Sequence, residues 1–331
     1  MTDPLTQLLA EREVLLVDGA MGTNLFALGL ANGAPGELWS VDRPGDVRSV
    51  YQGFVDAGSD IILTNSFGSN RFRFALHKLQ GRVPELNFAA AAIARDVADK
   101  AGRTVVVAGS MGPTGDVFEP LGPRTQAEAE EAFHEQAEAL KEGGADVAWI
   151  ETMFAENELE SAVRGAQRAG LPVVATMTFD TGGRTMMGIR PSDAMRLSKK
   201  LPARPLAFGA NCGIGPAQII DSVLGLAQGA EPGDVIVSKS NCGLPVMGDD
   251  MRVHYDGTPE IMAQYARLAR DAGARIIGGC CGTTATHVRA MAEALAGPRG
   301  AAPTYEEIER KLGPIRKITT KAQEKRALRQ P

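Results

Sequence analysis

The sequence has few cysteines, few aromatic residues and no long hydrophobic run. Only four of its 331 residues are cysteine, which is too sparse for a disulfide scaffold. No apolar stretch approaches the roughly 20 residues of a membrane-spanning helix. The first residues, MTDPLTQLLAEREV, are acidic where a signal peptide would be basic. We therefore expect a cytoplasmic protein without a membrane segment, whose cysteines are thiols or metal ligands.

An excess of positive charge is also missing. The formal net charge is -5, so no overall field would attract nucleic acid or an anionic lipid surface. Hydrophobic residues make up 44% of the chain and aromatic residues 5%, a composition typical of a globular α/β enzyme with a large core. These values favour a small molecule as ligand, and they leave a homo-oligomeric assembly open.

Eight short apolar runs recur along the chain, and they are continuous rather than alternating. This pattern is typical of parallel strands that are covered on both faces. The predicted strands are 14–17, 61–64, 105–108, 147–150, 173–176, 206–209, 235–238 and 275–277.

Helical patterns with ordinary start and stop signals separate these runs. Apolar residues at helical spacing predict a helix over 47–55, Thr125 with Glu128 predicts a capping box before a helix that ends at Gly143, and a helix is predicted over 258–273. Eight strand and helix repeats indicate an α/β fold, a single-domain (β/α)8 TIM barrel over 1–298, followed by a helical, basic tail over 299–331. A doubly wound sheet is the competing fold, but DGAMGTNL after the first strand does not match its glycine fingerprint.

The C-terminal ends of barrel strands form one rim, where active sites of such barrels lie. The residues that follow the predicted strands there are Asp18, Glu151, Asn211 with Cys212, Asn241 with Cys242, and Cys280 with Cys281. All four cysteines therefore share one rim, on three neighbouring strands. Thiolates gathered in this way suit zinc, three of them in a catalytic site with an open position or four in a closed structural site.

Simpler interpretations apply to each of these residues taken singly. A free cysteine is often a small buried hydrophobe, but four on one rim are hard to explain by chance. A bond between Cys280 and Cys281 would join α-carbons about 3.8 Å apart, below the usual disulfide range. None of the four histidines has metal-ligand spacing, and His287 falls in the first turns of a helix, where a packing or polar role is expected. Asp18 and Glu151 either cap helices or together hold an ammonium group, as an amino-acid substrate presents.

Four segments, VDGAMGTNL, ADVAWIET, GANCGIGP and GGCCGTTATH, resemble the homocysteine S-methyltransferase family, and the resemblance extends to about Gly297. It implies a zinc barrel in which Cys212, Cys280 and Cys281 are both the catalytic residues and the zinc ligands. The thiol of L-homocysteine would be the fourth ligand. Asp18, Gly19 and Glu151 match positions that hold the amino-acid part of homocysteine, and Asn211 is placed with them.

Two further expectations concern the cysteines and the glycines beside them. Cys242 lies outside the family's three-ligand pattern, and we expect it to pack rather than to serve as an exchangeable ligand. Gly278, Gly279 and Gly282 are expected to give the backbone the freedom to direct both adjacent cysteines inward.

The resemblance implies methyl transfer to a zinc-bound homocysteine thiolate, which gives methionine. Members of the family take the methyl group from betaine, from S-methylmethionine or from methylcobalamin. Trp39 is kept, but Gly68 and Thr152 stand where betaine enzymes have tyrosines for a cation–π cage. TNSFGSN, NCGIGP and NCGLP are closer to the homocysteine module of cobalamin-dependent methionine synthase, and a chain of this length leaves no room for the other modules. We therefore expect a stand-alone homocysteine module whose donor is methylcobalamin on a separate protein.

Three alternatives remain open. One is a transferase for betaine or another onium donor, with a cage built from Tyr51, Phe72 or Phe74. Another is a lyase or hydrolase that uses zinc-activated water, although such sites normally use histidine or carboxylate ligands. The third is a non-catalytic zinc or thiol-binding barrel, which would need all four cysteines.

Overall fold

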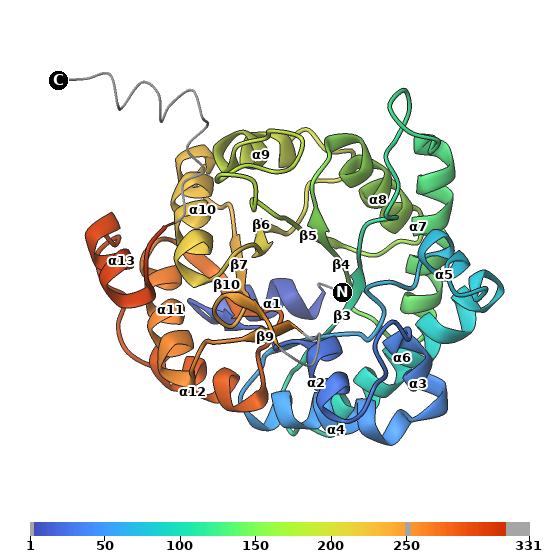
Figure 1. Cartoon of the computed structure of the whole chain (residues 1–331), viewed down its shortest axis with the longest axis horizontal. Coiled ribbons are helices and arrows are strands. Elements are labelled where there is room, and N and C mark those ends of the chain that lie inside the picture. The colour runs from blue at the N-terminus through green and yellow to red at the C-terminus, as the bar shows by residue number, and fades with distance from the viewer. Residues whose placement is uncertain (1–2, 249–252, 316–331) are drawn as a thin grey trace.

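The computed structural model describes residues 3–248 and 253–315, which form a closed eight-stranded parallel barrel with helices around it (Figure 1). The strand order is β1-β10-β7-β6-β5-β4-β3-β2. A parallel bridge between Val17 and Ile61 joins the first and last strands of this order and closes the barrel. The barrel strands are β1 (Leu15–Leu16), β2 (Ile61–Leu63), β3 (Val106–Met111), β4 (Val147–Met153), β5 (Val173–Met177), β6 (Ala207–Cys212), β7 (Ile236–Ser240) and β10 (Ala274–Gly279).

Helix α1 (Pro4–Glu11) precedes the first strand and packs against the inside of the barrel, and the later helices lie around the barrel. The later helices are α2 (Met21–Ala27), α3 (Trp39–Asp42), α4 (Pro44–Asp56), α5 (Arg71–Ala75), α6 (Val83–Asp99), α7 (Gln126–Glu142), α8 (Glu156–Arg168), α9 (Pro191–Ser198), α10 (Pro216–Gly229), α11 (Pro259–Asp271), α12 (Ala285–Leu295) and α13 (Tyr305–Leu312). Two 3-10 turns, Gly36–Leu38 and Gln80–Arg82, and an antiparallel hairpin of β8 (Pro245–Met247) and β9 (Val253–Tyr255) complete the described elements. No helix among the described residues has the length and apolar character to cross a membrane.

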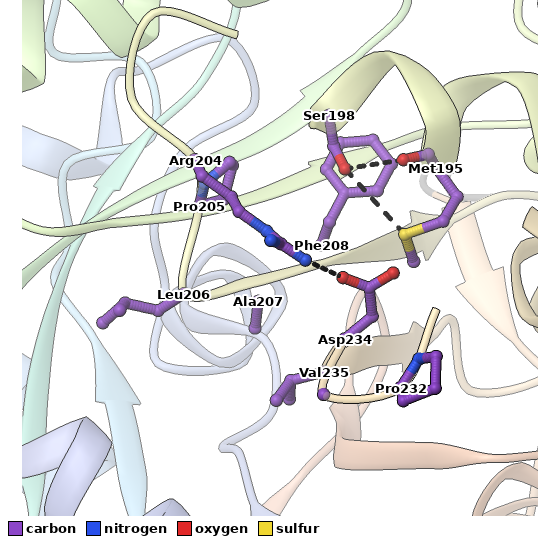
Figure 2. A pocket seen from close by; sticks show the side chains of 11 residues that line it. Met195, Ser198, Arg204, Pro205, Leu206, Ala207, Phe208, Pro232, Asp234 and Val235 are labelled. Carbon is purple, nitrogen blue, oxygen red and sulfur yellow. Dashed lines mark hydrogen bonds and ion pairs between the residues drawn. The ribbon is translucent and has the colours of Figure 1, made fainter. Parts of the chain in front are cut away.

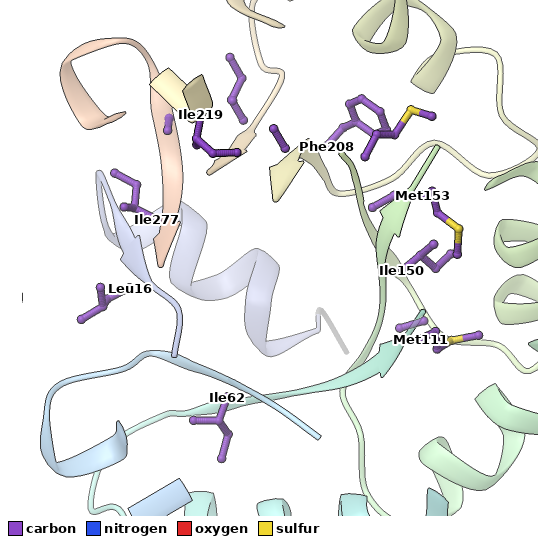
Figure 3. Close-up of a cluster of buried hydrophobic side chains, with 14 of the residues drawn as sticks. Leu16, Ile62, Met111, Ile150, Met153, Phe208, Ile219 and Ile277 are labelled. Carbon is purple, nitrogen blue, oxygen red and sulfur yellow. The ribbon is translucent and has the colours of Figure 1, made fainter. Parts of the chain in front are cut away.

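Two apolar clusters lie on the two faces of the strands, which explains why the strand sequences are continuously hydrophobic. The outer cluster packs between the strands and the helices and includes Leu16, Ile62, Ile150, Phe208 and Ile277 (Figure 3). The inner cluster fills the barrel together with Leu5 and Leu8 of α1, and its strand residues include Leu15, Val17, Ile61, Trp149, Val174, Val237 and Ile276. Because strand side chains alternate, the next inward positions towards the C-terminal rim hold polar residues, among them Glu151, Thr176 and Lys239.

All eight predicted strands and the three predicted helices are present, so the predicted (β/α)8 barrel is confirmed. The capping box before α7 is confirmed as well. Thr125 Oγ1 accepts from Glu128 N at 3.2 Å, and Glu128 Oε2 accepts from Thr125 N at 3.0 Å. Six strands continue beyond the predicted C-terminal bounds, since the apolar pattern stops where the polar rim begins.

The chain beyond residue 298 returns to the barrel as far as the structure describes it. Helix α13 packs on α10 and α11, Ile308 is fully buried, and the Tyr305 hydroxyl donates to Asp221 Oδ1 at 3.0 Å. Residues 316–331, where most of the predicted basic tail falls, lie outside the described residues. The division into a barrel over 1–298 and a tail over 299–331 stays a prediction.

Candidate functional site

Three of the four cysteines meet at the C-terminal rim of the barrel. Cys212 is the last residue of β6, and Cys280 and Cys281 directly follow β10. The sulfur atoms of these three residues all lie within 4.8 Å of one another, and Cys212 Sγ is 4.0 Å from Cys281 Sγ. Residues about 70 positions apart in the sequence thus form one cluster of free thiols.

An unusual backbone conformation directs Cys212 towards its partners. Its φ angle is +63°, in the left-handed region that non-glycine residues rarely adopt. The side chain of Asn241 holds this turn in place. Asn241 Nδ2 donates to the carbonyl of Gly213 at 2.8 Å, while Asn241 Oδ1 accepts from Cys212 Sγ at 3.4 Å and from Cys281 N at 3.1 Å. Asn241 therefore joins the two segments that carry the thiols.

The glycines around the adjacent cysteines act mainly through close packing, which corrects the expectation of backbone freedom. Only Gly282 has a positive φ, +80°. A Cβ on Gly278 would lie 2.7 Å from Cβ of Val17, and one on Gly279 would lie 2.2 Å from the side chain of Thr283. The strand end that carries Cys280 and Cys281 thus sits too close to its neighbours for any side chain at these two positions.

The three thiols influence one another's protonation. Hydrogen bonds with the other two thiols lower the pKa of Cys281 well below its usual value. The same contacts, with burial, raise the pKa of Cys212, because a second negative charge would then lie beside the first. A soft cation removes this repulsion, and three converging sulfur ligands are the donor set that zinc prefers. The residues present therefore fit a zinc ion.

Cys242 is set apart from this cluster. Its side chain is 1% exposed and donates from Sγ to the carbonyl of Gly257 at 3.3 Å. Burial raises the pKa of the Cys242 thiol to about 12, so that it stays protonated. Among the described residues, the group that could hold a metal contains Cys212, Cys280 and Cys281 but not Cys242.

Asp18 and Glu151 lie buried on the same rim, and each has one occupied carboxylate oxygen. Asp18 Oδ2 accepts from Leu63 N at 2.7 Å, and Glu151 Oε1 accepts from Ser110 Oγ at 2.5 Å. Within the described residues, Asp18 Oδ1 has no hydrogen-bond partner. The Asp18 carbonyl accepts from Gly279 N at 2.9 Å, so this acid is fixed beside the strand that carries the two adjacent cysteines.

Gly19 has a packing reason to be glycine. A Cβ there would lie 2.5 Å from the carbonyl oxygen of Thr283 and 2.8 Å from the ring of Phe54. The backbone after Asp18 therefore approaches the turn after Cys281 closely.

A buried lysine, Lys239 of β7, completes the acid pair, and the sequence analysis missed it. Its Nζ lies 3.6 Å from Asp18 Oδ1 and 3.9 Å from Glu151 Oε2. The signal was a lysine inside the otherwise buried run VIVSKSN, since an unpaired lysine is almost never fully buried.

Burial and charge act against each other in this group. Burial raises the pKa of Asp18 to about 7, although the positive charge of Lys239 opposes the shift. Burial likewise raises the pKa of Glu151. The two carboxylates raise the pKa of Lys239 against its own burial, so that the lysine stays charged.

A β-bulge presents Glu151, and Asn211 holds that bulge. The pairing of β4 with β5 shifts by one residue between Ile150 and Met153, and Thr152 in the bulge has a φ of +64°. Asn211 Oδ1 accepts from Thr152 N and from Thr176 Oγ1, both at 2.8 Å, and its Nδ2 donates to Thr152 Oγ1 at 2.8 Å. The amide nitrogen also lies 3.9 Å from Cys280 Sγ, so Asn211 links the bulge to the thiol cluster.

Tyr255 of β9 is a second residue that the sequence analysis missed. Its side chain hydrogen-bonds Cys281, and its ring packs so closely that a Cβ on Gly282 would lie 2.5 Å from it. The hairpin that carries Tyr255 therefore reaches the thiol cluster. His287, by contrast, takes the expected polar role: its Nδ1 accepts from Thr284 N at 3.1 Å at the start of α12.

The aromatic residues considered for an onium cage each have other contacts in this structure. Tyr51 is fully buried, and its hydroxyl accepts from Asn65 N at 2.6 Å. Phe74 is 1% exposed. The ring of Phe72 is covered by the guanidinium of Arg124, 3.5 Å from the ring centroid.

A cavity of about 220 Å³ lies at the opposite end of the barrel and is not part of this site (Figure 2). It is lined by residues at the N-terminal ends of β6 and β7, such as Leu206 and Val235. Arg204 and Asp234 form an ion pair of 2.6 Å beside it, so its charged groups already have partners.

Comparison with known proteins gives concordant results. A sequence model of the family described as "Homocysteine S-methyltransferase" matches residues 15–295. The chain is 34% identical to methionine synthase of Mycobacterium tuberculosis (strain ATCC 25618 / H37Rv) and 32% identical to that of Mycobacterium leprae (strain TN). Each match covers 88% of this chain and 25% of the relative, so the chain spans about a quarter of the length of these relatives.

Solved structures of the homocysteine methyltransferase MmuM from Escherichia coli are similar over most of the chain. The metallated form has a TM-score of 0.71 and 26% identity and covers 87% of this chain and 99% of that one. The oxidized form has a TM-score of 0.72 and 25% identity, with 88% and 99% covered.

Proposed function

Because the chain belongs to the homocysteine S-methyltransferase family, we propose that it transfers a methyl group to the thiol of L-homocysteine and so forms methionine. One observation carries the proposal: three converging thiols and a buried acid pair share the same rim. The three thiols can hold a metal ion that binds the thiol of a substrate, and the two acids can bind the ammonium group of an amino acid. A substrate that carries both groups fits this combination.

Cys212, Cys280 and Cys281 would hold zinc in this proposal. Their convergence within 4.8 Å leaves room in a tetrahedral site for one more ligand. When bound, zinc supplies the positive charge that keeps a coordinated thiol deprotonated at neutral pH. Asn241 and Tyr255 orient the thiols through their hydrogen bonds to Cys212 and Cys281.

Asp18 and Glu151 would orient the amino-acid part of the substrate. Asp18 Oδ1 has no hydrogen-bond partner among the described residues and is buried, so an ammonium donor would satisfy it. The bulge held by Asn211 fixes the second carboxylate, that of Glu151. Methyl transfer is an in-line displacement at the methyl carbon of the donor. The chain therefore contributes mainly by orienting the sulfur of homocysteine towards that carbon.

We further propose that the donor is methylcobalamin on a separate protein. The similarity to methionine synthases and the resemblance of the rim motifs to a homocysteine module support this donor. The burial of Tyr51 and Phe74 counts against a betaine cage at those residues. A cytoplasmic location belongs to the same proposal, because free thiols persist in a reducing compartment.

The experiment is methionine formation by the zinc-loaded protein with homocysteine and, in parallel, methylcobalamin, betaine or S-methylmethionine. Methionine from methylcobalamin supports the proposal, and Cys281→Ala is expected to abolish it. Methionine from betaine or S-methylmethionine alone would refute the donor assignment but keep the acceptor. If no donor reacts and isothermal titration detects no homocysteine binding to the zinc-loaded protein, the proposed acceptor is wrong.

A further inference from the structure

Lys239 is a buried charged residue to which the proposed function gives no role. It lies on β7, where its register partners are Asn211 of β6 and Gly278 of β10. It therefore stands between the strand that carries Cys212 and the strand that precedes Cys280. Burying an ammonium group is costly unless it is paired, so its place at the centre of the site requires an explanation.

The free oxygens of the two acids converge on this lysine. Lys239 Nζ is 3.6 Å from Asp18 Oδ1 and 3.9 Å from Glu151 Oε2, while Leu63 N and Ser110 Oγ occupy the other two oxygens. Both distances exceed the roughly 2.7–2.9 Å of a charge-assisted hydrogen bond. The lysine thus compensates the charge of both oxygens from longer range, and each oxygen can still accept a hydrogen bond from another donor.

The lysine is buried together with the acids. Side-chain exposure falls from 9% for Glu151 to 3% for Asp18 and 2% for Lys239. Its Nζ is 5.5 Å from the ring centroid of Trp149, which belongs to the apolar cluster that fills the barrel. A ligand that approaches from the rim therefore reaches Glu151, the most exposed of the three groups, before it reaches the lysine.

We propose that Lys239 is a positioning residue that keeps Asp18 and Glu151 ionised as a pair with one net negative charge, and so makes the site selective for thiols that carry one ammonium group. This inference rests on the proposed function, and it identifies the ammonium group as the feature of the substrate that the acid pair recognises. Without the lysine, two carboxylates in one buried site cannot both stay charged. The protonated one would then donate a hydrogen bond and no longer attract an ammonium group.

The test compares two thiols on the zinc-loaded protein without any methyl donor. Homocysteine carries the ammonium group, and 4-mercaptobutyrate has the same thiol and carboxylate without it. Isothermal titration gives both affinities for the wild type and for Lys239→Met. We expect the preference for homocysteine to fall roughly 10- to 100-fold in the variant, the range of one charge-assisted hydrogen bond. The affinity for 4-mercaptobutyrate should change less than about threefold.

Lys199→Met is the matched control. Lys199 is partly buried, with a side-chain exposure of 16%, and pairs with Glu231 and Asp234, but it lies at the far end of the barrel strands. Its replacement should leave the preference between the two thiols unchanged.

Each outcome is decisive. An equal loss of affinity for both thiols in Lys239→Met would show a merely structural role and overturn the inference, as would an unchanged preference. A wild type that binds neither thiol, or binds both equally, would instead overturn the proposed function. If Lys239→Met does not fold, the double variant Lys239→Met/Glu151→Gln should fold, because it removes the uncompensated carboxylate. Failure of the double variant would also refute the inference.

Discussion

Replacing Asn211 with alanine is expected to destabilise the protein by releasing the bulge that presents Glu151. Asn211 is fully buried and makes three hydrogen bonds of 2.8 Å, two to Thr152 and one to Thr176. At about 1 kcal/mol for each bond, the expected loss in the free energy of unfolding is about 3 kcal/mol. Homocysteine affinity should fall as well, because Glu151 is part of the bulge.

Thr152→Gly separates the role of these bonds from general packing. A β-branched residue at a φ of +64° is strained by about 1–2 kcal/mol, and glycine removes this strain. Glycine also loses one hydrogen bond of about 1 kcal/mol and adds about 0.5–1 kcal/mol of unfolded-state entropy. In the wild type these effects nearly cancel. In the Asn211→Ala background the bond is already lost, so Thr152→Gly should be more favourable there by about 1 kcal/mol.

The assay is a double-mutant cycle by denaturant unfolding, with the denaturant slope of each variant compared to exclude a change of mechanism. Asn87 provides the control, because it is equally buried and donates to the carbonyls of Ser69 and Val83. Asn87→Ala and Thr152→Gly should be additive. If Asn211→Ala and Thr152→Gly also add within about 0.5 kcal/mol, Asn211 does not hold the bulge.

Three further predictions concern the metal and the acid pair. Cys281→Ala should lose zinc on dialysis while Cys242→Ala retains it, measured by metal analysis; equal loss from both would indicate a four-cysteine site. Since burial raises the pKa of Asp18 to about 7 and only its carboxylate form attracts an ammonium, kcat/KM for homocysteine should fall as the pH drops from 8 to 6. Asp18→Asn should not show this fall in kcat/KM between pH 8 and 6. If the variant shows the same fall, another group titrates in this range. Removing zinc with a chelator should lower the unfolding temperature, because a ligand at 100 times its Kd stabilises the folded state by about 2.7 kcal/mol, and adding zinc back should restore it.

Much of the fold is readable from the chain because local patterns fix it. The continuous apolar runs identify all eight strands, and Thr125 with Glu128 identifies the start of α7. The rule that barrel strands end on one rim then predicts that Cys212 lies near Cys280 and Cys281, which the 4.8 Å grouping bears out. The substrate and metal roles of these residues stay predictions.

The residues that the sequence analysis missed depend on contacts between distant segments. Lys239 looks like an ordinary strand residue until Asp18 and Glu151 are brought within 4 Å of it. Tyr255 belongs to a hairpin whose place over Cys281 no local pattern indicates. The burial of Tyr51 is of the same kind, since an aromatic residue can face a ligand or the core, and only packing decides between them.

The sequence by itself therefore determined the barrel and the thiols that its rim gathers, because strand periodicity and strand direction are properties of neighbouring residues. Only the tertiary structure decided how those groups are aimed and charged. Side chains from other segments hold three of these features in place. They are the left-handed turn at Cys212, the bulge at Thr152 and the lysine beside the acid pair. Hydrogen bonds and charge pairs of this kind depend on distances between atoms in the folded chain, and the number of residues between two positions does not give those distances.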